Sequence, residues 1–372
     1  MKVALDVSAV PAHVAGAGRY IVELARRLPP QLESTTLVTR RDDSDRWREV
    51  SPDARVAPLV PPGRAGRLLY EAWRLGRSSA ARDADVWHSP HYTMPRHCLA
   101  PTVVTIHDLT FFTNPEWHER SKVLFFRRAI SYAAAHADVL LSVSEFTARQ
   151  LDEIMPVHVP VVVAPLGVDL ATFNLDGTND DAILRRHGLA TDVRYVFFLG
   201  TAEPRKGLDV LLEAFKELAH NDRTLELWIA GQAGWAMKDF DDEMARHPGA
   251  SRIRRLGFVD EELVAPLLRR ARVVTYPSRG EGFGLPVLEA LACGALVVTS
   301  ADTVMAEVGA SAVSLVEAGD AMALATEITR ALDLGEPQRA QHSRVARARA
   351  EEFSWEHCVN EHLKAYDLAR EG

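Results

Sequence analysis

The chain has 372 residues, of which 47% are hydrophobic and 25% charged, and its formal net charge is −8. This length exceeds what one ordinary core takes up, so we expect two domains, and the acidic balance argues against a nucleic-acid-binding protein. The cysteines Cys98, Cys293 and Cys358 stand far apart without CxxC spacing. That spacing argues against a disulfide framework or a cysteine-based zinc site and fits a reducing compartment.

Short apolar runs that are typical of strands alternate with amphipathic helical patterns along the chain. The runs lack polar alternation, which is typical of parallel strands buried on both faces. The first series predicts strands at 2–8, 36–40, 85–89, 102–108 and 138–144, with helices over 18–28 and 121–136. The second series predicts strands at 194–200, 225–231, 252–258, 272–278 and 295–300, with helices over 207–220, 260–270 and 286–293. This repeated alternation predicts two doubly wound α/β domains.

The boundary between the two series lies near 164–181, which contains Gly, Asn and Asp and has no helical period. We place the first domain at 1–170 and the second at 171–353, and we expect a last helix over 354–370 that packs back on the first domain. Ligands of open parallel sheets bind outside the carboxyl ends of the strands, so two facing sheets predict a ligand cleft between the domains.

No stretch approaches the roughly 18 to 20 uncharged apolar residues of a membrane span. Residues 1–10 also lack a signal-peptide pattern. We therefore expect a cytoplasmic protein.

The stretch RGEGFGLPVLEALACG (279–294) joins a predicted strand to a predicted helix. Its glycines allow tight turns, Pro286 suits a first helical position, and Gly294 suits the end of a helix. Free amides around Gly284 and Leu285 predict an anion site at the helix start.

Two glutamates flank this glycine-rich loop. We expect Glu289 in the first helical turn, where its carboxylate accepts from two neighbouring hydroxyls such as those of a ribose. Glu281 lies on the loop, where it accepts from sugar hydroxyls or balances positive charge in a transition state. The alternative is a glutamate that stabilises its own helix terminus and a loop acid that points into water.

The segment EGFGLPVLEALACG resembles the signature of retaining glycosyltransferases with the two-domain GT-B fold. The resemblance is to the large nucleotide-sugar-dependent family four, also called glycosyl transferases group 1, and covers nearly the whole chain. It implies two Rossmann-like domains that face each other across a cleft and a nucleotide-sugar donor, with no cofactor and no metal. It assigns catalysis to Glu281 and donor binding to Gly282, Phe283, Gly284, Leu285 and Glu289.

The segment FFLGTAEPRKG (197–207) places Arg205 and Lys206 at the carboxyl end of a strand. An arginine binds two phosphate oxygens and a lysine acts as a point charge, so the pair suits a diphosphate. The resemblance implies that both hold the donor diphosphate. Many relatives carry an arginine directly after the strand's glycine, whereas here Thr201 follows Gly200, so it stays open whether Arg205 supplies the second cation.

Two further segments of the first domain fit the same family. The small-residue loop 15–18 opens a helix but lacks the third glycine of a dinucleotide fingerprint, which argues against a dehydrogenase. In the family this loop contacts the donor β-phosphate, which assigns Gly16 with Gly18 in support, although such loops are more often packing devices. The segment TIHDLTF places a His–Asp pair at a strand end, and the resemblance assigns His107 to the transferred sugar, with Asp108 in support.

Three more stretches carry functional alternatives. His88 and His91 form an HxxH pair without a third ligand at sensible spacing, so we favour an acceptor-side loop over a metal site. The resemblance implies that the loop around Val259 meets the nucleotide base, while 230–235 also follows a strand. Basic and large apolar residues mix in 63–82 and 121–130, so either stretch can contact the inner face of the cell membrane; an ordinary helix with a solvated basic face is the alternative.

The predicted activity is transfer of a hexose from a nucleotide sugar to a hydroxyl of a glycan or lipid-linked acceptor, with retained anomeric configuration. The overall pattern is most similar to GDP-mannose-dependent mannosyltransferases of surface-polysaccharide or glycoconjugate biosynthesis. Two alternatives stay open, which are a UDP-dependent glucosyl- or N-acetylglucosaminyltransferase and a non-catalytic subunit that binds sugar nucleotides.

Overall fold

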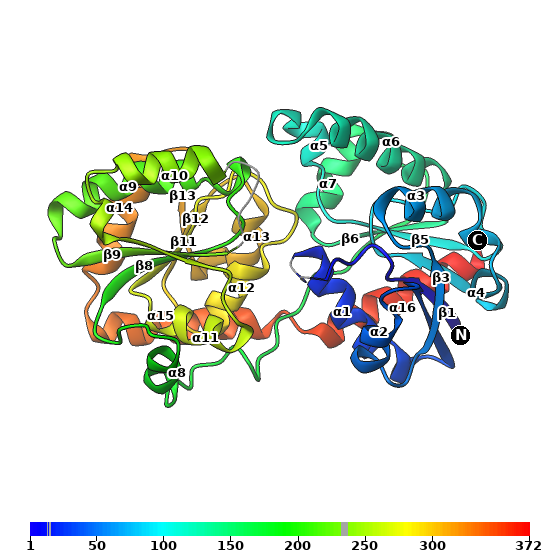
Figure 1. Cartoon of the computed structure of the whole chain (residues 1–372), viewed down its shortest axis with the longest axis horizontal. Helices are drawn as coiled ribbons and strands as arrows, with labels where there is room; N and C mark the ends of the chain where they lie inside the picture. The colour runs from blue at the N-terminus through cyan, green and yellow to red at the C-terminus, as the bar shows by residue number, and fades with distance from the viewer. Residues whose placement is uncertain (13, 15, 232–236) are drawn as a thin grey trace. The chain divides into compact units, whose positions relative to one another are not determined.

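The computed structural model describes the chain except residues 13, 15 and 232–236. It divides into two compact units, one formed by Met1–Gly167 with Ser354–Gly372 and the other by Val168–Phe353. Each unit contains one parallel sheet covered by helices (Figure 1). The predicted fold class, two doubly wound parallel-sheet α/β domains, is therefore confirmed. No helix among the described residues is long and apolar enough to cross a lipid bilayer.

The sheet of the first unit has seven strands, all paired in parallel. In spatial order they are β3 (Arg55–Val60), β2 (Ser34–Arg40), β1 (Lys2–Asp6), β4 (Val86–Ser89), β5 (Thr102–Ile106), β6 (Val139–Ser142) and β7 (Val161–Val163). The chain winds outward from β1 through β2 to β3, and then from β4 through β7 in the other direction. The strand order thus reverses between β1 and β4, the place where doubly wound sheets bind ligands.

Helices cover both faces of this sheet. They are α1 (Ala17–Arg27), α2 (Ser44–Val50), α3 (Arg64–Trp73), α4 (Ser79–Asp83), α5 (Thr110–Thr113), α6 (Arg120–His136), α7 (Glu145–Ile154) and α16 (Trp355–Glu371). In Figure 1, α1 and α16 lie on one face and α3 and α6 on the other. All five residues of β5 are buried, which agrees with a strand covered on both sides.

The last helix, α16, completes the polar part of the first unit's core. On this helix, His362 contacts the Tyr20 hydroxyl through Nε2 at 2.6 Å, and the Tyr366 hydroxyl contacts His88 Nδ1 at 2.9 Å. Thr105 Oγ1 joins the two pairs, at 3.0 Å from the Tyr20 hydroxyl and 2.9 Å from His88 Nε2. Burial lowers the pKa of His362 to about 4, so this network is neutral at physiological pH.

The sheet of the second unit has six parallel strands. Their spatial order is β10 (Ile253–Gly257), β9 (Leu225–Ala230), β8 (Arg194–Leu199), β11 (Val273–Tyr276), β12 (Val297–Ser300) and β13 (Ser314–Val316). The helices are α8 (Asp180–Arg186), α9 (Leu208–Asn221), α10 (Met237–Arg246), α11 (Glu261–Arg270), α12 (Leu285–Ala292), α13 (Val304–Gly309), α14 (Ala321–Leu332) and α15 (Glu336–Glu351). Helices α9 and α14 lie on one face, and α11, α12 and α15 on the other (Figure 1). The strand order of this second sheet reverses between β8 and β11.

The sequence did not predict three strands, β3, β7 and β13, and all three lie at sheet edges. β3 contains Pro58, which removes a ladder donor and is tolerated at an edge. β7 and β13 have three residues each, and one face or end of each is exposed or half-buried. Short edge strands carry a weak hydrophobic pattern, because fewer of their side chains face a core.

Candidate active site

The candidate phosphate-binding turn follows β8, the first strand of the second unit. Pro204–Lys206 forms one 3₁₀ turn, and Gly207 ends it in the left-handed conformation with φ of 68°. A Cβ atom on Gly207 would lie 2.0 Å from the Pro277 carbonyl oxygen, so only glycine lets this turn pack against the segment after β11. The turn therefore lies at the point where the strand order of the second sheet reverses.

Several hydrogen bonds tie this turn to the loop that follows β11. The backbone N–H of Arg279 donates to the Arg205 carbonyl at 2.7 Å, and its guanidinium donates to the Pro204 carbonyl at 2.7 Å. The same guanidinium also donates to Asp209 Oδ1 at 2.9 Å, at the start of α9. Arg279 thus fixes the two loops relative to each other.

Glu281 forms ion pairs with both candidate phosphate-binding cations. Arg205 Nη1 lies 2.6 Å from Glu281 Oε2, and Lys206 Nζ forms an ion pair with Oε1. Ser278 Oγ donates to Oε1 at 3.3 Å, and Glu203 holds the other side of the Arg205 guanidinium at 2.8 Å. Burial alone would raise the pKa of Glu281, but Arg205 and Lys206 lower it to about 2, so the carboxylate is ionised at neutral pH.

Helix α12 begins beside this cluster. Gly284 precedes the helix with φ of 93°, and a Cβ atom there would lie 2.5 Å from Met305 Sδ on α13. Phe283 and Leu285 are buried, and the Phe283 ring packs edge-on against Phe353 with 5.8 Å between centroids. These contacts fix the start of the helix. The Leu285 N–H is too near the helix start to have an acceptor within the helix, Pro286 has no N–H, and the Val287 N–H donates to the Gly284 carbonyl at 3.0 Å.

The expectation for Glu289 needs a correction. Helix α12 begins at Leu285, so Glu289 falls in the second turn, and the first turn contains no acidic residue. The helix starts one residue earlier than expected because Pro286 occupies its second position rather than its first. Glu289 is 4% exposed and raises the pKa of the buried Tyr276 hydroxyl, after burial itself.

The candidate residues of the first unit lie after β1 and β5. Gly16 precedes α1 with φ of 51°, and the space around its missing Cβ is open, so the backbone itself is accessible there. Gly18 is buried inside α1 against Val10 and Val14. Ala15 of the same loop lies outside the described residues. The open backbone at Gly16 suits contact with a ligand oxygen, whereas Gly18 serves packing.

His107 and its neighbour Asp108 bond to different partners. His107 Nε2 lies 2.9 Å from the Pro90 carbonyl oxygen, which only accepts, so Nε2 carries the proton. Burial lowers the pKa of His107, which leaves Nδ1 as an acceptor for a hydroxyl. Asp108 accepts from the Tyr92 hydroxyl at 2.9 Å and from Thr110 Oγ1 at 2.6 Å. Asp108 therefore supports the loop around His107.

The structure also places the two predicted loops around His88 and Val259. His88 lies within β4 and is fully buried in the network with Tyr366, so it belongs to the core and not to a loop. Val259 lies in the exposed connection between β10 and α11, next to Phe258, whose side chain is 61% exposed. Most of the segment 230–235 lies outside the described residues.

The comparison with known proteins follows the same division of the chain. Residues 14–172 match the family model described as Glycosyltransferase Family 4, and residues 179–349 match the model described as Glycosyl transferases group 1. O-antigen chain mannosyltransferase B of Escherichia coli is 30% identical over 383 residues, which cover 99% of this chain and 100% of the relative. The chain belongs to the glycosyl transferases group 1 family. This glycosyltransferase acts in glycan biosynthesis.

Solved structures agree with this family at the level of the fold. Sucrose-phosphate synthase from Thermosynechococcus elongatus superposes on the glycosyltransferase with a TM-score of 0.79 at 21% identity, covering 98% of both chains. HepE of Anabaena, solved in complex with UDP-glucose, gives a TM-score of 0.77 at 18% identity and covers 98% of this chain and 99% of its own. The expected GT-B fold is confirmed, as two parallel-sheet domains.

Residues that the sequence reasoning missed support those that it found. Arg279 and Glu203 orient the cations of the glycosyltransferase, and Tyr92 holds Asp108 from a loop sixteen residues away in sequence. Arg279 directly precedes the glycine-rich loop in sequence, and this position could have indicated its supporting role. Tyr92 carries no such signal, because only the parallel pairing of β4 with β5 brings it to Asp108.

Proposed function

We propose that the enzyme transfers mannose from GDP-mannose to a hydroxyl of a glycan or lipid-linked acceptor in surface polysaccharide or glycoconjugate biosynthesis, with retained configuration. The observation that carries the proposal is the convergence of Arg205, Lys206 and Glu281 beside the start of α12. Two cations and the backbone amides around Gly284 and Leu285 at a helix start suit a diphosphate leaving group. The whole-length similarity to a mannosyltransferase supports the choice of sugar.

The proposed reaction breaks the bond between the sugar C1 and the diphosphate oxygen and forms a bond from C1 to the acceptor oxygen. Attack comes from the face that the diphosphate leaves, and the acceptor proton goes to the leaving phosphate oxygen. Arg205, Lys206 and the amides at Gly284 and Leu285 stabilise the negative charge on the leaving group. Glu281, ionised at neutral pH, orients the sugar and stabilises its developing positive charge. The protein supplies the charge that a metal ion would otherwise bring to the diphosphate.

His107 fits a supporting role toward the sugar. Its Nε2 proton is committed to the Pro90 carbonyl, so its Nδ1 lone pair is the atom available to accept from a sugar hydroxyl. The backbone of Gly16, with open space around it, is proposed to reach a donor phosphate oxygen. Neither residue needs to change protonation during the reaction.

A peripheral contact with the membrane is proposed for the stretch 63–82 rather than for 121–130. In the first stretch the side chains of Leu69 and Trp73 are 66% and 56% exposed, and Arg74 and Arg77 are exposed beside them. In the second, Phe126 packs against a core cluster, and Leu124, which is 58% exposed, is the one large apolar side chain of that stretch that is exposed among the described residues. Exposed apolar side chains next to arginines suit an anionic lipid surface.

The experiment that tests the function is a turnover assay with a panel of nucleotide sugars, preceded by thermal shifts with GDP, UDP, GDP-mannose and UDP-glucose. We expect GDP and GDP-mannose to stabilise the enzyme most, because a ligand that binds only the folded state raises its stability. Anomeric coupling constants of the product, measured by NMR, report retention. Selective stabilisation by the uridine compounds favours the glucosyl- or N-acetylglucosaminyltransferase alternative. Binding without turnover in the presence of lipid-linked acceptors favours the non-catalytic alternative.

A further inference from the structure

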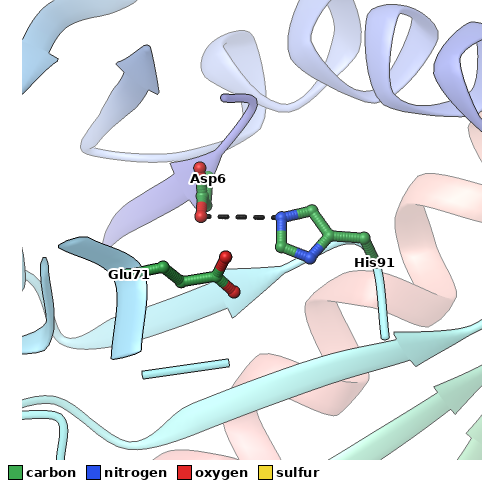
Figure 2. Close-up of side chains that lie close together, drawn as sticks. All are labelled: Asp6, Glu71 and His91. Atoms are coloured by element: carbon green, nitrogen blue, oxygen red, sulfur yellow. Dashed lines mark ion pairs between the residues drawn. The ribbon is translucent and has the colours of Figure 1, made fainter. Parts of the chain in front are cut away.

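Three ionisable side chains meet at the carboxyl ends of β1 and β4 in the first unit (Figure 2). Asp6 is the last residue of β1, His91 follows the end of β4 by two residues, and Glu71 comes from α3. One ligand atom of each lies within 4.8 Å of the others. The cluster thus occupies the reversal point of the first sheet, where ligands of doubly wound folds bind.

Each side chain is held by its second polar atom, which directs the first one into the cluster. The three holding contacts are Ser8 N–H to Asp6 Oδ1 at 3.0 Å, Arg67 Nη1 to Glu71 Oε2 at 2.8 Å and Thr93 Oγ1 to His91 Nδ1 at 3.0 Å. Within the described part of the chain, the remaining atoms, Asp6 Oδ2, Glu71 Oε1 and His91 Nε2, are buried and have no hydrogen-bond partner. Asp6 is 0% and Glu71 2% exposed.

Three buried polar atoms without hydrogen-bond partners are unusual, because such atoms cost free energy unless something binds them. Two carboxylates in one buried place also repel each other, and Arg67 supplies a single positive charge against them. An additional cation among the three atoms removes both costs.

The distances favour an ion between the side chains over a direct pair. His91 Nε2 lies 3.5 Å from Asp6 Oδ2, which is longer than a charge-assisted hydrogen bond of about 2.8 Å. Two ligands about 2.0 Å from a tetrahedral ion lie about 3.3 Å apart, close to the observed spacing. One imidazole and two carboxylates form a donor set of borderline hardness, which zinc accepts readily.

We propose that Asp6, Glu71 and His91 bind one divalent transition-metal ion of the zinc type. The contacts from Ser8, Arg67 and Thr93 are the outer hydrogen bonds that orient metal ligands in such sites. The ion joins β1, the segment after β4 and α3. That segment includes Pro90, whose carbonyl accepts from His107, so the ion also stiffens the support of His107. The three proposed ligands belong to the first unit, whereas Arg205 and Lys206 belong to the second.

The test uses the full-length protein, stripped with a chelator and dialysed, and Zn²⁺ alone as the probe. We expect calorimetry to give one tight site per chain, Zn²⁺ to raise the Tm, and Co²⁺ to give the visible absorption bands of a four- or five-coordinate N/O site. His91→Gln and Glu71→Gln keep the size of each side chain and remove one ligand. Each is expected to weaken binding at least tenfold.

The matched control is His158→Gln, which removes an exposed histidine of the same unit and leaves the affinity unchanged. Circular dichroism of each variant checks that it is folded, and Glu71→Gln serves if His91→Gln fails that check. Less than a tenth of an equivalent of bound Zn²⁺ in the wild type overturns the proposal. Equal affinity in wild type and both ligand variants overturns it as well. An absence of glycosyl transfer by a wild type that binds one Zn²⁺ contradicts the proposed function only.

Discussion

Replacement of Glu281 by glutamine separates two roles of this carboxylate, namely balancing the cations and assisting the sugar. In the folded protein Arg205 and Lys206 hold its pKa at about 2, against 4.5 for an unperturbed glutamate. That difference corresponds to roughly 3 kcal/mol at neutral pH, taken as an upper limit because the side chain keeps some contact with water. We expect the variant to unfold at a Tm roughly 5 to 10 °C below the wild type.

The pH dependence of this loss has a definite sign. The folded-state pKa lies below the unfolded value, so the stabilisation from Glu281 is fully present above about pH 4.5 and is lost as the pH falls toward 2. The difference in free energy of unfolding between wild type and variant should therefore be constant from pH 5 to 8 and shrink below pH 4.5. Urea unfolding followed by tryptophan fluorescence measures it.

The affinity of the same variant for GDP should rise, although its stability falls. A diphosphate competes with Glu281 for Arg205 and Lys206, so the loss of the carboxylate frees both cations. We expect the Kd for GDP to fall by about tenfold or more, equivalent to about 1.4 kcal/mol, while turnover drops at least about a hundredfold. Glu317→Gln, an exposed glutamate of the same unit, is the control and changes neither quantity. Weaker GDP binding in Glu281→Gln, or an unchanged Tm, would refute the reasoning.

Three further changes test other parts of the molecule. Lys206→Ala removes one of the two cations and should raise the Kd for GDP and UDP about tenfold or more in calorimetry; an unaltered affinity puts the phosphate site elsewhere. Gly284→Ala places a Cβ atom 2.5 Å from Met305 Sδ at a φ of 93° and should cost about 1 to 3 kcal/mol of stability, whereas Gly188→Ala, at a φ of 69° in open space, shows the backbone cost alone. Trp73→Glu should lower binding to anionic vesicles at least fivefold in a sedimentation assay; equal binding argues against this surface as the membrane contact.

The fold could be predicted from sequence where its strands are buried on both faces. The central strands carry unbroken apolar runs, and their order follows from the alternation with helices. The edge strand β3 escaped, because Pro58 and half-buried positions weaken its pattern. The position of Glu289 in its helix was wrong by one residue, which moves it from the first turn to the second, because a proline at a helix start fits either of the first two positions.

The candidate site was predictable where its residues lie in one contiguous motif. Glu281 and the two cations each follow a strand, and adjacent parallel strands bring their ends together. The cluster of Asp6, Glu71 and His91 could not be predicted from spacing, because its members come from a strand end, a helix and a loop. An HxxH pair suggests two metal ligands from one segment. In the structure, however, His88 is buried in the core network with Tyr366, and of this pair His91 alone belongs to the cluster.

The return of α16 to the first unit has a consequence for biosynthesis and for protein engineering. Tyr20 and His88 each contact Thr105 within the first 167 residues, but their second polar partners, His362 and Tyr366, lie on the final helix. The polar network of the first unit is therefore complete only after the second unit has been translated in full. A fragment that stops at Gly167 contains all seven strands but lacks the partner of His88 Nδ1 and the second partner of the Tyr20 hydroxyl. A stand-alone version of this unit therefore has to carry the helix along, joined by a linker in place of the excised middle of the chain.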